Sequence, residues 1–194
     1  MGNTWAKLIW APALLSSTFV NPVFAQDTNA YSFAPATRLE SFATNVGTVI
    51  IRGSTDIGVV SADAGSIVLK CREASDAGSG RKELGISVDL NHGQQLRETR
   101  LVDYDELESL INALAYLNKV DWSITSLSSF DAGITTRSGF RASAFSSRRS
   151  SAIEFAVRTV GSGNPPILLS RDQMAELRGM LEQGRARLDS IRTK

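Results

Sequence analysis

The chain has 194 residues, with 21 Lys and Arg, 20 Asp and Glu, one His, one Cys and 42% hydrophobic residues. This length and apolar content suffice for a packed core, and the near-zero net charge argues against wholesale disorder and against nucleic-acid binding. One Cys and one His exclude an internal disulfide framework, Cys-based zinc sites, iron–sulfur clusters and His-rich metal sites, so we expect neither a metal nor a cofactor.

The first 25 residues have the features of a secretory signal peptide. Lys7 supplies the positive charge, residues 8–20 form an uncharged and largely apolar stretch, and Val23 and Ala25 are small residues suited to a cleavage site. The apolar stretch is too short for a spanning helix, which needs about 20 residues. We therefore predict cleavage after Ala25, a mature domain of residues 26–194 without a transmembrane segment, and a secreted or periplasmic location.

The mature region is expected to consist mainly of short strands. Segments that are rich in β-branched residues, or that alternate apolar and polar residues between Gly, Ser, Asp and Asn, predict strands. The segment 74–82 between two of them is expected to be a loop. The predicted strands are 48–52, 57–61, 67–72, 84–90, 96–102, 120–124, 130–134, 140–144 and 153–157.

Two amphipathic helices are expected, one in each half. Asp103 and Glu106 form a capping-box pattern before a helix over 104–118, and Ser170 and Gln173 repeat it before a helix over 171–191. Apolar residues recur at helical spacing in both segments, so each helix must cover a sheet or the other helix. The fold class is therefore α+β, with one or two antiparallel sheets of about eight or nine short strands packed by two helices.

An internal similarity suggests that the two halves correspond. Shifted by 67 residues, the apolar positions of 86–90 fall on those of 153–157, and the caps and apolar positions of the first helix fall on those of the second. One hypothesis for this pattern is a pseudo-duplication of 46–118 and 120–192 within a single domain. The simpler explanation is that any two antiparallel hairpins that lead into amphipathic helices look alike.

Few residues offer catalytic chemistry. A Ser–His–Asp site would have to use His92, which falls in an expected hairpin turn, and no nucleophile-elbow motif is present. Cys71 is in phase with the apolar face of a strand, so we expect a buried side chain. The carboxylates at 103, 105, 106 and 108 would suit glycoside hydrolysis, but capping and the helix dipole explain them more simply. These residues leave a hydrolase as the least favoured hypothesis.

Charge is unevenly distributed along the chain. Residues 26–120 hold 9 basic and 13 acidic side chains, whereas residues 121–194 hold 11 basic and 7 acidic ones. Four arginines of the second half, Arg137, Arg141, Arg148 and Arg149, are candidates for binding an anionic envelope component or an acidic protein partner. The alternative is a solvated strand face and turn.

These observations favour an exported, non-enzymatic binding module or cell-envelope accessory protein. A second hypothesis is a carrier that holds a small hydrophobic ligand between sheet and helices, which requires that the strands leave the helix stripes incompletely covered. No motif in the sequence identifies a family.

Overall fold

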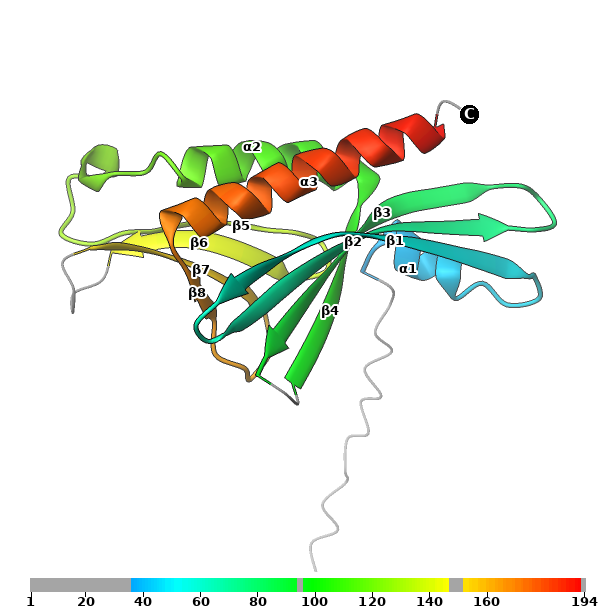
Figure 1. The fold of residues 1–194 in the computed structure, drawn as a ribbon, viewed down its shortest axis with the longest axis horizontal. Coiled ribbons are helices and arrows are strands. Elements are labelled where there is room, and N and C mark those ends of the chain that lie inside the picture. The colour runs from blue at the N-terminus through cyan, green and yellow to red at the C-terminus, as the bar shows by residue number, and fades with distance from the viewer. Residues whose placement is uncertain (1–35, 94–95, 147–151, 193–194) are drawn as a thin grey trace, which may run out of the picture. The chain divides into compact units, whose positions relative to one another are not determined.

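The computed structural model describes residues 36–93, 96–146 and 152–192 (Figure 1). The predicted signal peptide, residues 1–25, lies outside these ranges, and its cleavage stays a prediction. Within the described ranges, no helix combines the length and the apolar character needed to cross a membrane.

In the described ranges, eight antiparallel strands form two four-stranded sheets, each ordered as in the sequence. The predicted α+β class is thereby confirmed. The first sheet contains β1 (Ile50–Ala62), β2 (Gly65–Asp76), β3 (Lys82–His92) and β4 (Leu96–Asp103). The second sheet contains β5 (Asp131–Thr135), β6 (Phe140–Ser146), β7 (Ile153–Thr159) and β8 (Ile167–Leu169).

Each sheet is followed by one of the two expected helices. A 3₁₀ turn, Tyr104–Glu106, leads into α2 (Leu107–Leu117), and α3 (Arg171–Arg192) follows β8. The capping pattern of α3 is confirmed, since Gln173 N donates to Ser170 Oγ over 3.1 Å and Ser170 N donates to Gln173 Oε1 over 2.7 Å. Before α2, Glu106 accepts the backbone N–H of Asp103 over 3.4 Å.

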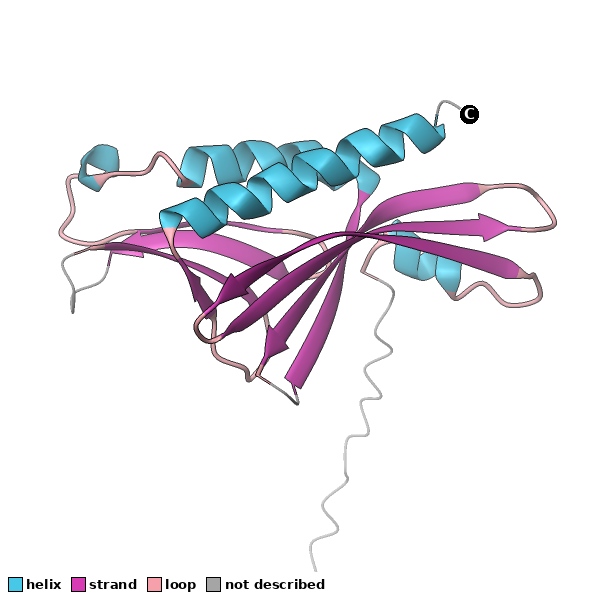
Figure 2. Ribbon diagram, viewed as in Figure 1, coloured by secondary structure: helices cyan, strands magenta, loops and turns pink. Residues whose placement is uncertain are grey.

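Helices α2 and α3 lie side by side over the same face of both sheets (Figures 1 and 2). Helix α2 packs on β5 and β6, while α3 crosses from β7 and β8 to β1, β2 and β3. The apolar stripes of both helices and the inward side chains of both sheets form one continuous cluster. Because one core joins the two halves, the described residues form a single domain with two sheets.

Three local predictions are wrong. The predicted segments 48–52 and 57–61 are not separate strands, because residues 50–62 form one strand, β1. Its polar middle still pairs with β2, and its register shifts between Asp56 and Gly58. Segment 120–124 is not a strand, because Asp121 accepts the Ser123 N–H over 2.8 Å and holds Trp122–Ile124 as a 3₁₀ turn. The expected loop 74–82 is shorter, since β2 continues to Asp76 and β3 begins at Lys82.

A third helix, α1 (Arg38–Ala43), was not predicted. It packs on the opposite face of the first sheet, where Leu39 and Phe42 are buried against Ala74. The Asp103 carboxylate accepts the backbone N–H groups of Arg38 over 2.8 Å and of Leu39 over 3.1 Å. The start of α1 is therefore held by the end of β4.

The two sheets share their strand order, but their last hairpins differ in register. In the first sheet Ile86 pairs with Val102, whereas in the second Phe155 pairs with Leu169. A uniform shift of 67 residues would instead place Phe155 on Val88. The hairpins therefore differ by two residues, and the proposed duplication of 46–118 and 120–192 stays a prediction.

Candidate functional site

The four arginines singled out in the sequence are not brought together by the fold. Arg148 and Arg149 lie outside the described residues. Arg137 lies in the turn between β5 and β6, near the start of α2, whereas Arg141 lies on β6 in the second sheet. Arg137 and Arg141 must therefore be considered separately.

Arg137 is held by carboxylates of its own chain. Its Nη1 donates to Asp103 over 2.9 Å, its Nη2 donates to Asp105 over 2.8 Å, and its backbone N–H donates to Glu106 over 2.8 Å. The hydrogen bond from Arg137 is the main influence that holds the pKa of Asp105 below its ordinary value, and the same bond raises the pKa of Arg137. This cluster links the second sheet to the end of the first.

The remaining acidic residues of this segment are paired as well. Arg38 adds a second ion pair to Asp105, and Glu108 pairs with Arg185 of α3 over 3.2 Å. The carboxylates that would suit glycoside hydrolysis therefore serve as contacts between elements. Among the described residues, no group of three or more His, Cys, Asp or Glu side chains is placed to hold a metal ion.

The outer face of the second sheet points away from α2 and α3, and its side chains form regular rows. Phe140, Ala142 and Ala144 point into the core, so alternate residues of β6 point outward. The pairing register arranges the outward residues in three rows that cross the strands. The basic row is Thr135–Arg141–Arg158, the middle row is Gly133–Ser143–Ala156–Leu168, and the third row is Asp131–Phe145–Glu154.

Arg141 and Arg158 are directly opposed across β6 and β7. The two donor–acceptor pairs from Arg141 Nη2 to the Asp131 carboxylate measure 3.1 and 3.0 Å. A Cβ atom at Gly133 would come within 3.0 Å of the Arg141 guanidinium, so the glycine leaves room for this ion pair. Arg158 is exposed and has no ion-pair or hydrogen-bond partner in the part of the chain that the structure describes.

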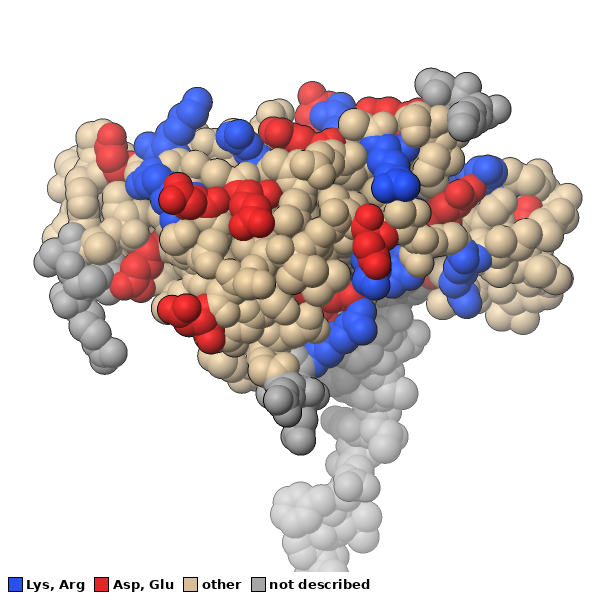
Figure 3. All heavy atoms as spheres, in the orientation of Figure 1, with Lys and Arg blue, Asp and Glu red and all other residues tan. Residues whose placement is uncertain are grey.

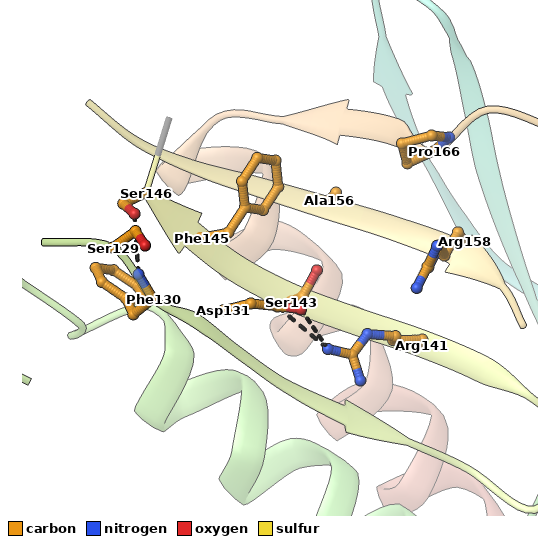
Figure 4. Close-up of a pocket in the computed structure, with 10 residues that line it drawn as sticks. All are labelled: Ser129, Phe130, Asp131, Arg141, Ser143, Phe145, Ser146, Ala156, Arg158 and Pro166. Atoms are coloured by element: carbon orange, nitrogen blue, oxygen red, sulfur yellow. Dashed lines mark hydrogen bonds and ion pairs between the residues drawn. The ribbon is translucent and has the colours of Figure 1, made fainter. Parts of the chain in front are cut away.

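A groove of about 640 Å³ lies over these rows (Figure 4). Its middle is floored by the small side chains of Ser143 and Ala156. Ser143 is only 9% exposed, its hydroxyl points toward the groove in Figure 4, and it has no hydrogen-bond partner among the described residues. We call this feature the cross-strand groove. The residues that line it are Ser129, Phe130, Asp131, Arg141, Ser143, Phe145, Ser146, Ala156, Arg158 and Pro166.

The only histidine belongs to a polar cluster between the sheets. His92 ends β3 and is partly buried, with its Nε2 atom unpartnered among the described residues, rather than lying in an exposed turn. Glu98 of β4 accepts hydrogen bonds from Ser162 Oγ and Asn164 Nδ2. Burial, the largest single influence, acts to raise the pKa of Glu98, but these bonds and nearby His92 hold it below its ordinary value.

This cluster does not have the connections of a catalytic triad. A serine nucleophile must donate its proton to the histidine, which the carboxylate in turn orients. Here Ser162 donates directly to Glu98, and the imidazole ring of His92 makes no hydrogen bond among the described residues. The cluster instead ties β4 of the first sheet to the loop between β7 and β8.

Sequence reasoning identified Arg141 but missed Arg158, Ser143 and Phe145. The alternation of 153–157 predicts that Arg158 points outward, but it does not predict which residue lies opposite. Pairing register depends on the connection between strands, and the sequence between β6 and β7 carries no specific turn motif. The groove could therefore be found only from the structure.

Comparison with known proteins gives no match, whether to a family model, to a curated protein or to a solved structure. The function must accordingly be argued from the residues of this chain.

Proposed function

We propose that this protein is an exported, non-enzymatic binding module that holds an acidic partner on the outer face of the second sheet. The observation that carries the proposal is the direct opposition of Arg141 and Arg158 on an open strand face, with Asp131 neutralising only one of them. The signal-peptide pattern supports the exported location.

The arginine pair favours an anionic partner for a physical reason. Like charges directly opposite each other in a sheet destabilise it. A carboxylate or phosphate placed between the two guanidinium groups would relieve the part of this repulsion that the ion pair of Arg141 with Asp131 leaves, and could accept paired N–H donors from either one. The unpartnered hydroxyl of Ser143 adds a hydrogen-bonding group on the groove floor.

Overall charge does not explain such a site. The face seen in Figure 3 shows basic and acidic side chains interspersed, without a large area of one sign. Attraction of an acidic partner would therefore depend on the local arrangement of Arg141 and Arg158. We expect a short-range, specific contact with a modest salt dependence.

The carrier hypothesis gains no support from the packing. A carrier needs a cavity between sheet and helices, where the strand side chains leave part of the apolar face of a helix uncovered. Instead, Leu110, Leu114, Leu177 and Leu181 are at most 1% exposed and belong to the same cluster as the inward strand residues. The open groove on the opposite face of the second sheet is the better candidate for a binding site.

Titration of residues 26–194 with poly-L-glutamate tests the proposal. The Trp122 ring lies 6.0 Å from that of Phe130, which lines the groove, so tryptophan fluorescence should report binding. Arg158→Gln should weaken binding at least about fivefold, corresponding to about 1 kcal/mol. Arg187→Gln removes another exposed arginine, on α3, and should leave the affinity unchanged. Equal weakening in both variants, or in neither, would overturn the proposed site.

A further inference from the structure

The cross-strand groove has two chemically different walls. Arg141 and Arg158 stand on one side of the small residues Ser143 and Ala156, and Phe145 stands on the other (Figure 4). Arg141 and Phe145 are four residues apart on one strand, which separates the walls by about 13 Å. A ligand that lies along the floor therefore meets two arginines on one side and, on the other, Phe145, which stands between Asp131 and Glu154 in the third row.

The groove also has a limited length. The middle row runs across all four strands, from Gly133 on β5 to Leu168 on β8. Three strand spacings of about 4.8 Å make about 14 Å, which four residues of extended polypeptide would cover. At the β5 end, the ion pair joins Arg141 of the basic row to Asp131 of the third row and passes over Gly133 of the middle row.

We infer that the ligand of the cross-strand groove is an extended acidic polypeptide segment in which carboxylate and apolar side chains alternate. The inference rests on the proposed function and specifies its partner. Successive side chains of an extended chain point to opposite sides. Acidic side chains at every second position would face Arg158, while the intervening apolar side chains would face Phe145.

The lining favours a polypeptide over a lipid. An acyl chain is stabilised by removal of its apolar surface from water, but this groove is open to solvent and is lined by three serines, Ser129, Ser143 and Ser146. The hydroxyl of Ser143, which has no partner among the described residues, can instead bond a peptide N–H or C=O group, which an extended backbone presents along its whole length. An alternating acidic peptide thus matches the floor and both walls.

Two fluorescein-labelled peptides of identical composition test the inference by fluorescence anisotropy. One alternates glutamate and leucine, and the other holds the same residues in two separate blocks. The alternating peptide should bind residues 26–194 at least about fivefold more tightly. Phe145→Ala should abolish this preference, whereas Val59→Ala, which truncates an exposed apolar side chain on β1, should retain it.

The outcomes separate this inference from the proposed function. Equal affinity for both peptides, with dependence on Arg158, would overturn the alternating ligand and leave the acidic partner intact. Absence of binding to both peptides and to poly-L-glutamate would overturn both. Binding to phosphatidylglycerol vesicles that depends on Phe145, without binding to either peptide, would replace the polypeptide with a lipid surface. Circular dichroism of each variant excludes a folding defect as the cause.

Discussion

The missing side chain of Gly184 determines how closely α3 approaches the first sheet. A Cβ atom at this position would lie 2.6 Å from Ile57 Cδ1 and 2.7 Å from Ile86 Cδ1. Both contacts are far inside normal carbon–carbon distances, and Ile86 is fully buried. Replacement of Gly184 by Ala should therefore force side-chain or helix movement in the core.

Gly179 on the same helix provides the matched control, because a Cβ atom there would meet no atom within 4 Å. Alanine is favoured over glycine in a helix interior by about 1 kcal/mol, so Gly179→Ala should stabilise by up to that amount. Gly184→Ala has the same propensity gain but adds an overpacking cost of about 1–3 kcal/mol. The two variants should thus differ by about 1–3 kcal/mol in the free energy of unfolding.

Urea denaturation followed by circular dichroism measures this difference. The melting temperatures should separate by about 2–4 °C for each kcal/mol in a chain of this length. Ile57→Val removes the nearest Cδ1 atom and should recover part of the loss in Gly184→Ala. If Gly184→Ala stabilises the protein as much as Gly179→Ala, α3 does not approach the first sheet as closely at Gly184 as the structure shows.

Three further predictions concern the Arg137 cluster, the burial of Cys71 and the signal peptide. Arg137→Met leaves the buried Asp103 without its guanidinium partner and should destabilise the fold by about 1–3 kcal/mol in urea denaturation; Arg187→Met should cost little, and equal losses would contradict the role of the cluster. Burial raises the pKa of the Cys71 thiol, so iodoacetamide at pH 8 should modify Cys71 in urea but not in the native protein, and rapid native labelling would contradict its burial. Mass spectrometry of the exported protein should find Gln26 at the N-terminus, whereas an intact Met1 would refute the signal peptide.

Much of the fold could be predicted because its signals are local. Alternation in 84–90 and helical spacing in 107–117 identify the elements, and the capping residues indicate their starts. Helix α1 was missed although Thr37 and Glu40 form a capping box, because six residues are too few for a periodic apolar pattern. Strand β1 was divided in two because its polar middle is an edge segment held by backbone pairing, which leaves no apolar signal.

The candidate site depends on pairing between strands, which local patterns do not encode. Arg137 and Arg141 lie four residues apart in the sequence, yet one binds the acidic cluster near α2 and the other lies on the cross-strand groove. Arg158 becomes relevant only because β6 and β7 place it opposite Arg141. If the pairing of β6 with β7 were shifted by one residue, Arg158 and Arg141 would point to opposite faces of the sheet.

The outer faces of the two sheets differ in a way that favours the second as the binding face. Helix α1 covers part of the first sheet, where Lys70 forms an ion pair with Asp56. Asp89 on β3 is fully buried, accepts a hydrogen bond from Thr99 over 2.7 Å and pairs with Arg97. On the second sheet Arg158 is exposed, and the described helices that contact this sheet, α2 and α3, lie on its opposite face (Figure 1).

This contrast predicts opposite effects of two similar substitutions. Arg97→Gln removes the cation from a buried carboxylate and should destabilise the protein by about 1–3 kcal/mol. Arg158→Gln removes a like-charge repulsion and leaves no carboxylate unpaired, so it should be neutral or should stabilise the fold by up to about 1 kcal/mol while weakening poly-L-glutamate binding. A residue that lowers stability while it supports binding is retained for binding rather than for folding. Destabilisation by Arg158→Gln comparable to that by Arg97→Gln would assign Arg158 a structural role and remove the basis for the proposed site.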